Sequence, residues 1–257
     1  MKPKTIITDF SNVYYDFAQL IGNEVIDCSS IDGTNCFLDS DAQVRLQEIL
    51  MPLRSDGGVS SAPSLHWLDS GDYHYMSKLW MEGIEVPFTL VLMDHHPDMQ
   101  LPQFGDMLSC GSWVRATRMS NPNLQRVVMF GVADELKEEA SESYVTFVSE
   151  SRLKGMSPFD IEKLISTIDF DDSIYISIDK DVMSEKFAKT NWDQGSMTLL
   201  QVEAVADAVS EDRRILGVDF CGERAESKGG VEADFMLNLR TNLELQSFFE
   251  KRLDSER

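Results

Sequence analysis

The side chains in this sequence that are best suited to chemistry lie in one pentapeptide, Asp94-His95-His96-Pro97-Asp98. Asp94, His96 and Asp98 occupy alternating positions, so extended backbone can direct all three to one side. Two carboxylates and one imidazole form a ligand set that suits Mn²⁺, Fe²⁺ or Zn²⁺. A polar loop with hydrogen-bonded histidines would show the same pattern. Because loops at strand ends often carry function, we expect a metal site here.

A second acidic cluster occurs later in the chain, at Ser177-Ile178-Asp179-Lys180-Asp181. Asp179 and Asp181 again alternate, and the intervening Lys180 is expected to point away from them as an outward ion-pair partner. Taken alone, the cluster fits equally well a strand end where Asp179 caps a turn and Asp181 is solvated. Together the two clusters supply more ligands than one tetrahedral ion needs. That surplus predicts two metal ions bridged by carboxylates.

The chain has four histidines, and all of them lie between residues 66 and 96. His74 ends the segment Gly71-Asp72-Tyr73-His74 and could supply a further nitrogen ligand. The alternative is that Asp72 caps a helix and His74 packs between tyrosines. His66 alternates with apolar residues inside an expected strand, so we expect it to lie in the core.

Strands and helices alternate along the sequence around these residues. Short apolar runs predict strands at Thr5–Asp9, Ser64–Leu68, Phe88–Met93, Arg126–Phe130, Tyr144–Val148, Ser173–Ile178 and Ile215–Phe220. Helical spacing predicts helices at Ala42–Leu53, Tyr73–Met81, Pro158–Ile168, Leu199–Val209 and Glu244–Leu253, with a loop at 55–61. This order predicts an α/β fold, with a mostly parallel sheet covered by helices on both faces. We expect one domain over residues 1–257.

Acidic residues stand where several of these expected strands end. Asp94, Asp179 and Asp219 each lie at the end of a different strand, and Glu223 follows shortly after the last of them. Open parallel sheets bind ligands beyond the carboxyl ends of their strands. The sequence therefore predicts that these side chains gather at one edge of the sheet.

Composition excludes several classes of function. The chain has 257 residues, 42% of them hydrophobic, and a formal net charge of −21. Such acidity argues against nucleic acids and anionic membranes as partners. No apolar run is long enough for a transmembrane helix, and the start lacks a signal-peptide core. Four cysteines without CxxC spacing predict reduced thiols and a cytoplasmic location, with Cys28 and Cys36 the only pair considered for a disulfide.

Few other catalytic motifs compete with the metal site. The sequence contains no GxSxG, Walker or GxGxxG motif. Cys110 is a candidate thiol nucleophile, but no histidine follows position 96 to activate it. A buried structural cysteine is the preferred interpretation.

The clusters resemble, in type and order, the motifs of the ureohydrolases (arginase, agmatinase and relatives) in the arginase/deacetylase superfamily. The matching segments are Gly71-Asp72-Tyr73-His74, Asp94–Asp98, Ser177–Asp181 and Glu223. The resemblance covers residues 66–225 and implies a three-layer α/β/α domain of the arginase type. It also implies two Mn²⁺ ions, with Fe, Co or Zn as alternatives, and it allows a homo-oligomer.

The resemblance assigns roles to single residues. One ion would be held by His74, Asp94, Asp98 and Asp179, and the other by His96, Asp94, Asp179 and Asp181. Asp94 and Asp179 would then bridge the ions. Two cations lower the pKa of bound water, which allows attack on a guanidinium carbon at neutral pH. Asp98 would orient that water, and Glu223 would pair with the cationic guanidino substrate.

The sequence departs from the family pattern in several places. Tyr73 is an insertion in the first motif, and Glu223 stands four residues after Asp219 instead of three. Residues 108–113 contain no histidine, although ureohydrolases carry a proton-shuttling histidine in this region. Residues 191–195 lie where the family has substrate-facing loops, but a turn before a helix is slightly preferred.

The leading hypothesis is a binuclear metal hydrolase that cleaves a linear guanidino or amidine C–N bond of a small cationic molecule. A single-Zn²⁺ amide deacetylase of the same superfamily is an alternative, although the upstream His-His pair of those enzymes is absent. A metal-binding homologue without catalysis is the alternative from another class, and the missing histidine favours it.

Overall fold

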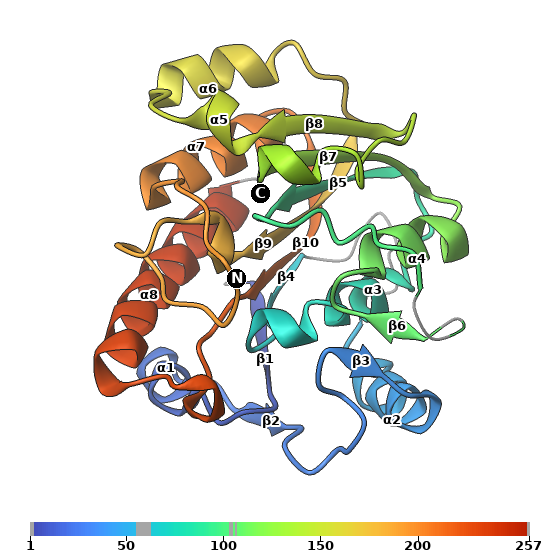
Figure 1. The fold of residues 1–257 in the computed structure, drawn as a ribbon, viewed down its shortest axis with the longest axis vertical. Coiled ribbons are helices and arrows are strands. Elements are labelled where there is room, and N and C mark those ends of the chain that lie inside the picture. The colour runs from blue at the N-terminus through green and yellow to red at the C-terminus, as the bar shows by residue number, and fades with distance from the viewer. Residues whose placement is uncertain (1–2, 55–62, 103–104, 106, 256–257) are drawn as a thin grey trace.

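A parallel β-sheet forms the centre of the computed structural model, which describes residues 3–54, 63–102, 105 and 107–255. The strand order is β2-β1-β4-β10-β9-β5-β7-β8, and all of these neighbours pair in parallel (Figure 1). The strands are β1 (Lys4–Asp9), β2 (Val25–Asp27), β4 (Ser64–Trp67), β5 (Phe88–Met93), β7 (Leu124–Val132), β8 (Val145–Ser149), β9 (Ser173–Asp179) and β10 (Arg214–Cys221). The predicted loop at 55–61 lies outside the described residues. A separate antiparallel pair joins β3 (Phe37–Leu38) to β6 (Leu108–Ser109).

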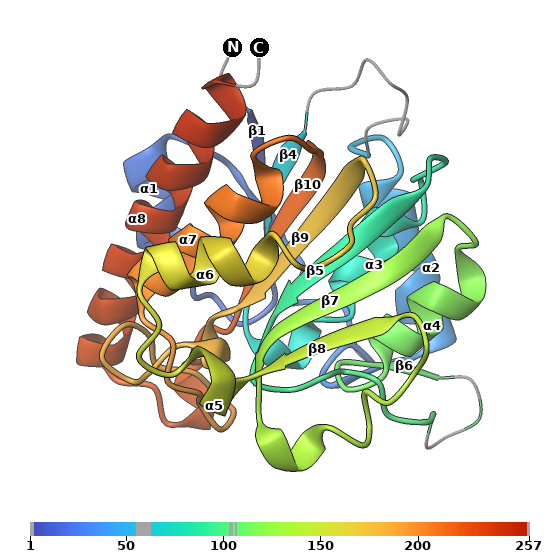
Figure 2. The same ribbon diagram turned by 90° about the horizontal axis from the view of Figure 1, so that it is seen from above.

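Helices cover both faces of this sheet, as Figure 2 shows. One face carries α1 (Tyr15–Ile21), α6 (Pro158–Ile165), α7 (Leu199–Ser210) and α8 (Glu232–Ser255). The other carries α2 (Ser40–Leu50), α3 (Met76–Met81) and α4 (Trp113–Ser120). Shorter pieces are α5 (Glu150–Leu153) and the 3₁₀ turns η1 (Gly71–Tyr73), η2 (Asp134–Leu136), η3 (Lys180–Val182) and η4 (Glu226–Lys228). These layers confirm the predicted α/β/α fold.

The strands are hydrophobic because both faces of the sheet are buried. Every residue of β5 is buried, and its side chains alternate between the two cores. Val91 and Met93 face the layer of α6, α7 and α8, whereas Leu90 and Leu92 face the layer of α2, α3 and α4. A continuous apolar run is typical of such a doubly covered parallel strand. Many of the polar side chains therefore lie at the strand ends.

Helix α8 is much longer than its sequence pattern predicts. It begins at Glu232, twelve residues before the predicted start at Glu244. Its buried side includes Asn238, Asn242 and Gln246, which are at most 3% exposed. Polar residues on the core side remove the apolar periodicity on which the prediction relied. No described helix is both long and apolar enough to cross a membrane.

We predict that Trp67→Ala lowers the free energy of unfolding by about 3–5 kcal/mol. The Trp67 indole is fully buried in β4, with its ring centroid 4.3 Å from that of Phe220 and 4.5 Å from that of Phe17. Its Nε1 also donates to Gln246 Oε1 on α8 at 2.9 Å, so truncation leaves a cavity and an unpaired amide. Urea denaturation measures the loss. Leu200→Ala, at a 59% exposed position of α7, is the control and should change stability by less than about 0.5 kcal/mol. Equal losses in the two variants would contradict the prediction.

Candidate metal centre

Four neighbouring strands of the sheet, β4, β10, β9 and β5, deliver polar side chains to one place. His74 follows β4, Cys221 ends β10, Asp179 ends β9 and Asp94 follows β5. Potential metal-ligand atoms lie within 4.8 Å of one another in three groups, namely His74/Asp94/Asp98, Asp94/His96/Asp181 and His74/Asp179/Cys221. All six residues predicted as ligands from the sequence therefore fall into connected groups at the expected edge of the sheet.

The first group surrounds the imidazole of His74. Its Nδ1 lies 3.2 Å from Asp94 Oδ2, 3.1 Å from Asp98 Oδ2 and 3.6 Å from Asp179 Oδ2. Ligand atoms that share one cation through bonds of about 2.1 Å lie roughly 3.0–3.4 Å apart. The spacing of these side chains therefore fits a small divalent cation.

Ser177 orients the imidazole of His74 from the opposite side. His74 Nε2 lies 2.9 Å from Ser177 Oγ, so a proton on Nε2 would be donated to the serine and the Nδ1 lone pair would face the carboxylates. The inserted Tyr73 ends the 3₁₀ turn η1 and stacks on Phe10, with ring centroids 4.1 Å apart. The insertion is thus accommodated in a tight turn, and His74 itself lies among carboxylates instead of between tyrosines.

The second group joins Asp94 to His96 and Asp181. His96 Nδ1 is 2.9 Å from Asp181 Oδ2 and 3.7 Å from Asp94 Oδ1. Asp94 thus turns one oxygen toward each histidine, which is the arrangement of a bridging carboxylate. Asp94 Oδ1 also accepts the backbone N–H of His96 at 2.7 Å, just as Asp179 Oδ1 accepts that of Asp181 at 2.9 Å. Asp179 differs in that a histidine, His74, faces its Oδ2 alone.

Burial makes this concentration of charge unfavourable unless cations compensate it. Asp94 Oδ2 is buried without a hydrogen-bond partner. Burial and the nearby Asp94 carboxylate raise the pKa of Asp98 to about 7. Burial alone would lower the pKa of His96, but the Asp181 and Asp94 carboxylates outweigh it and raise that pKa to about 12. Without metal, protons therefore supply part of the positive charge that the carboxylates require.

A cavity of about 320 Å³ opens above these groups. Beside the acidic residues it is lined by Cys36, Phe37, Gly71, Gln100, Ser109, Cys110, Gly111 and Trp192. Trp192 Nε1 donates to Asp72 Oδ1 at 2.9 Å, and this bond holds the loop at 191–195 against the turn that precedes His74. The preferred interpretation of this loop as a simple turn was therefore incomplete, because Trp192 forms part of the cavity wall.

The cavity offers little besides the acidic groups for proton transfer. His96 is the sole histidine among its described lining residues. His95 is not part of that lining, and its Nδ1 lies 4.0 Å from Glu150. Cys110 is partly exposed at the wall, so the expectation of a buried structural cysteine was wrong. A hydrogen bond with Cys36 and burial raise the pKa of the Cys110 thiol, which opposes a role as a nucleophile.

The glutamate predicted to bind substrate lies away from this cavity. Glu223 is buried and contacts Lys180 Nζ, while Asn242 and Asn238 of α8 donate to its two oxygens at 2.7 Å and 2.8 Å. These contacts leave the predicted guanidinium contact of Glu223 without support. Lys180 is fully buried and not outward as expected, because η3 turns it under the sheet edge toward α8.

His66 and Asp219 form a separate buried pair within the sheet. His66 Nδ1 lies 2.7 Å from Asp219 Oδ1, and its Nε2 lies 2.7 Å from Ser64 Oγ. The ring stacks on Trp80 with centroids 3.9 Å apart, and Tyr175 donates its hydroxyl to Asp219. This arrangement confirms the prediction of a core histidine. It also explains why Asp219, despite its place on β10, does not join the ligand groups.

Two residues that contact the candidate ligands were not predicted from the sequence. Trp113, at the start of α4, donates Nε1 to Asp98 Oδ2 at 2.5 Å. Cys221 donates Sγ–H to Asp179 Oδ2 at 3.1 Å. Cys221 stands two residues after Asp219 on the same strand, so strand alternation alone could have placed the two side chains on the same face of the sheet. No comparable signal pointed to Trp113.

We predict that Lys180→Met lowers the free energy of unfolding by about 3–5 kcal/mol, because Glu223 is left as a buried unpaired charge. The double variant Lys180→Met/Glu223→Gln should recover most of that loss. Lys189→Met, which removes an exposed pair with Glu185, is the control and should cost less than about 1 kcal/mol. Chemical denaturation of the metal-free proteins measures all three. A double variant as unstable as the single one would contradict this account.

Comparison with solved structures finds the same fold in several ureohydrolases. Formimidoylglutamase from Bacillus subtilis subsp. subtilis str. 168 superposes with a TM-score of 0.68 at 14% identity, covering 98% of this chain and 88% of that one. Proclavaminate amidino hydrolase from Streptomyces clavuligerus gives 0.66 at 15% identity, covering 97% and 91%. Arginase from Bacillus cereus gives 0.64 at 13% identity, covering 96% and 98%.

Sequence comparison gives more specific evidence than the fold. An uncharacterized protein of Thermotoga maritima is 29% identical over 222 residues, which is 86% of this chain and 80% of that protein. The model of the arginase family matches residues 73–222 and so includes all three ligand groups. Because this match spans more than half of the sequence and agrees with the resemblance in the motifs, the chain belongs to the arginase family.

Proposed function

We propose that this protein is a hydrolase with a binuclear metal centre that cleaves a linear guanidino or amidino C–N bond in a small cationic molecule. The observation that carries the proposal is Asp94, whose two oxygens face two separate histidines at the floor of one cavity. Proclavaminate amidino hydrolase, whose name states its chemistry, has the same fold. The proposal joins that family chemistry to the ligand groups of this chain.

One ion would be held by His74, Asp94, Asp98 and Asp179, and the other by Asp94, His96 and Asp181. Bound there, two divalent ions would lower the pKa of water and supply a nucleophile at neutral pH. The predominance of carboxylate oxygens suits Mn²⁺, with Fe²⁺, Co²⁺ or Zn²⁺ as alternatives. The chain itself supplies orientation, since Ser177 holds the His74 ring and Trp113 holds the Asp98 carboxylate.

Asp98 is the residue proposed to act on the reacting water. It lines the cavity, and the Trp113 indole fixes its Oδ2. A carboxylate held at this place can accept a hydrogen bond from the reacting water and receive its proton. No described histidine other than His96 reaches the cavity, so this proton transfer would not follow the histidine route expected from the resemblance.

The described side chains of the cavity favour a cationic substrate over an anionic one, because they include no lysine or arginine. Asp94, Asp98, Asp179 and Asp181 also line the cavity, and the two proposed ions would balance their charge. Trp192 and Phe37 add aromatic faces, which attract a planar guanidinium cation. A substrate carboxylate would meet no cationic side chain among these residues, so a guanidino or amidino compound without a nearby carboxylate fits better.

The absence of a proton-shuttling histidine from residues 108–113 supports one competing function, a metal-binding homologue without catalysis. The metal and activity measurements described below distinguish this homologue from the hydrolase. A single-Zn²⁺ deacetylase is less well supported, because two of the three ligand groups share the Asp94 carboxylate and contain different histidines.

We predict that protein reconstituted with Mn²⁺ and freed of loose metal binds two ions per chain and hydrolyses at least one member of a panel of guanidino and amidino compounds. Asp181→Ala should bind one ion and lose activity, because its side chain belongs to the second group alone. Elemental analysis and detection of released urea, amine or ammonia measure the two effects. Asp193→Ala, at an exposed position of the loop at 191–195 that does not line the cavity, is the matched control and should retain both.

Fewer than one ion per wild-type chain, or full metal content in Asp181→Ala, would contradict the binuclear centre. Two ions with no turnover across the guanidino panel and a matching panel of acylated amines, but with ligand binding retained, would favour the non-catalytic homologue. One tightly held Zn²⁺ with amide hydrolysis would favour the deacetylase.

We predict that Trp192→Ala raises KM about 3- to 30-fold and changes kcat less, because an aromatic face contributes about 0.5–2 kcal/mol to the binding of a cation. Trp192→Phe retains a ring but loses the bond to Asp72, so it should lie close to wild type if the ring face is what matters. Steady-state kinetics measures both constants, with a compound from the guanidino and amidino panel that the protein hydrolyses as the substrate. A KM that rises equally in the two variants would show that the Asp72 bond, and not the ring, carries the effect.

A further inference from the structure

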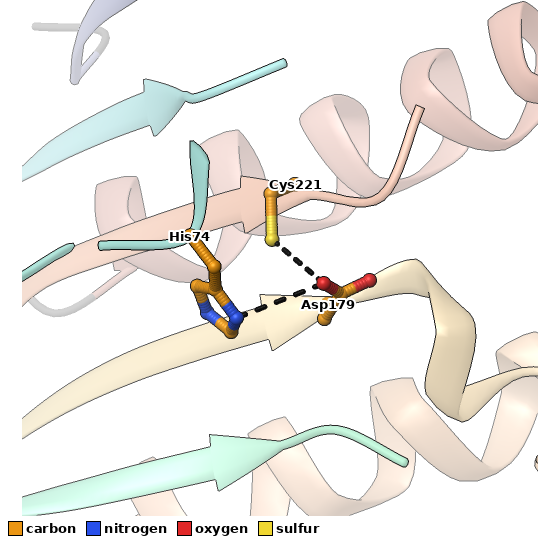
Figure 3. Close-up of side chains that lie close together, drawn as sticks. All are labelled: His74, Asp179 and Cys221. Atoms are coloured by element: carbon orange, nitrogen blue, oxygen red, sulfur yellow. Dashed lines mark hydrogen bonds and ion pairs between the residues drawn. The ribbon is translucent and has the colours of Figure 1, made fainter. Parts of the chain in front are cut away.

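A thiol that belongs to no family motif faces the candidate metal centre. Figure 3 shows the His74 imidazole and the Cys221 thiol pointing at the same carboxylate, that of Asp179. Cys221 Sγ lies 3.1 Å from Asp179 Oδ2, and the same oxygen lies 3.6 Å from His74 Nδ1. The three residues, which end or follow three neighbouring strands, are all buried. Their ligand atoms lie within 4.8 Å of one another.

The register of the sheet places the thiol there. Cys221 of β10 is paired in parallel with Asp179 of β9, so both side chains leave the sheet on the same face. Two residues earlier the same face carries Asp219 and Ser177, also paired, and Ser177 is the residue that orients His74. Cys221 thus occupies the position on β10 that lies level with the metal-ligand carboxylate of β9.

Gly222 allows this close approach. It has φ +91°, and a Cβ built on it would lie 2.4 Å from Asp179 Oδ1 and 2.7 Å from the backbone nitrogen of Lys180. Any side chain here would displace the Asp179 carboxylate, and the positive φ is strained for residues other than glycine. The turn after Cys221 is therefore packed directly against the candidate ligand.

The distances around Cys221 fit a shared cation. Ligand atoms on one ion, with bonds of about 2.1 Å to nitrogen or oxygen and about 2.3 Å to sulfur, lie roughly 3.0–3.6 Å apart when the angle between the bonds is about 90–110°. The measured separations of 3.1 Å and 3.6 Å are close to that range. Independently, Asp94 Oδ2 is buried without a hydrogen-bond partner and points at His74 Nδ1 from 3.2 Å. A buried carboxylate oxygen without a hydrogen bond is suited to contact a cation, and here it lies on the same side of the centre as His74.

We propose that Cys221 Sγ is a ligand of the ion held by His74 and Asp179, which makes this half of the centre a mixed nitrogen, oxygen and sulfur site. The proposal rests on the binuclear centre of the proposed function. On binding, the S–H bond breaks, a sulfur–metal bond forms and the proton leaves to solvent. The other half, Asp94/His96/Asp181, contains only nitrogen and oxygen ligands.

The two halves then prefer different ions. Thiolate favours Zn²⁺, Fe²⁺ or Co²⁺ over Mn²⁺, whereas a carboxylate-rich set accepts Mn²⁺. The half at His74 would therefore select a softer ion than the half at His96. A protein that binds one Zn²⁺ or Fe²⁺ tightly and a second ion less selectively is the expected consequence.

Titration of the metal-free protein with Co²⁺ tests the proposal without reference to activity. Wild type should develop a sulfur-to-cobalt charge-transfer band in the near ultraviolet, together with the weaker visible bands of bound Co²⁺. Cys221→Ser should lose the charge-transfer band and retain the visible bands. It should also weaken Zn²⁺ affinity about 10- to 100-fold and Mn²⁺ affinity less, because serine removes only the soft ligand.

The double variant Cys36→Ser/Cys110→Ser is the matched control, because these thiols line the cavity but belong to none of the ligand groups. It should keep the charge-transfer band, and loss of the band there would overturn the assignment to Cys221. Bound Co²⁺ without the band in wild type would overturn it as well. If no variant binds Co²⁺, the binuclear centre itself is wrong.

X-ray absorption of the Zn²⁺-loaded wild-type protein needs no substitution, so it decides the question even if Cys221→Ser does not fold. A sulfur neighbour at about 2.3 Å is expected. A shell of nitrogen and oxygen alone would overturn the proposal.

Discussion

The burial of four carboxylates at the carboxyl edge of one parallel sheet is the constraint on which the rest of the structure depends. Asp94, Asp98, Asp179 and Asp181 are each at most 7% exposed. Charges of one sign cannot be removed from water together unless cations or protons compensate them. Two histidines inside the group meet part of this need, and the divalent ions proposed to bind there would meet the rest.

The surrounding structure keeps those carboxylates at fixed positions. Ser177 and Trp113 orient the ligand side chains from outside the group. On the other face of the sheet, buried Lys180 joins the turn between Asp179 and Asp181 to Glu223 and so to α8. A site that gathers carboxylate oxygens within 4.8 Å of one another needs such support, because repulsion would otherwise spread the side chains apart.

The floor of the cavity is typical of the family, whereas its wall is particular to this chain. The acidic floor and the order of its motifs follow the family. The described residues of the wall include Trp192, Cys36 and Cys110 but no shuttle histidine. Specificity depends on such wall residues more than on the fold, since one fold can carry many activities. The proposed sulfur ligand at Cys221 is a second departure, and it acts on the choice of metal instead of on the substrate.

The sequence by itself determined seven of the eight strands of the sheet and pointed to most of the candidate ligands, because both depend on local periodicity. Continuous apolar runs marked the seven predicted strands, and alternation placed Asp94, His96 and Asp98 on one side. It could not predict the full length of α8, whose core side carries amides that pair across the fold. Only the tertiary structure decided that Lys180 forms an ion pair with Glu223, that Trp192 lines the cavity and that Cys221 lies beside Asp179. Each of these contacts joins residues more than 30 positions apart, and their pairing depends on strand order and register, which local patterns do not encode.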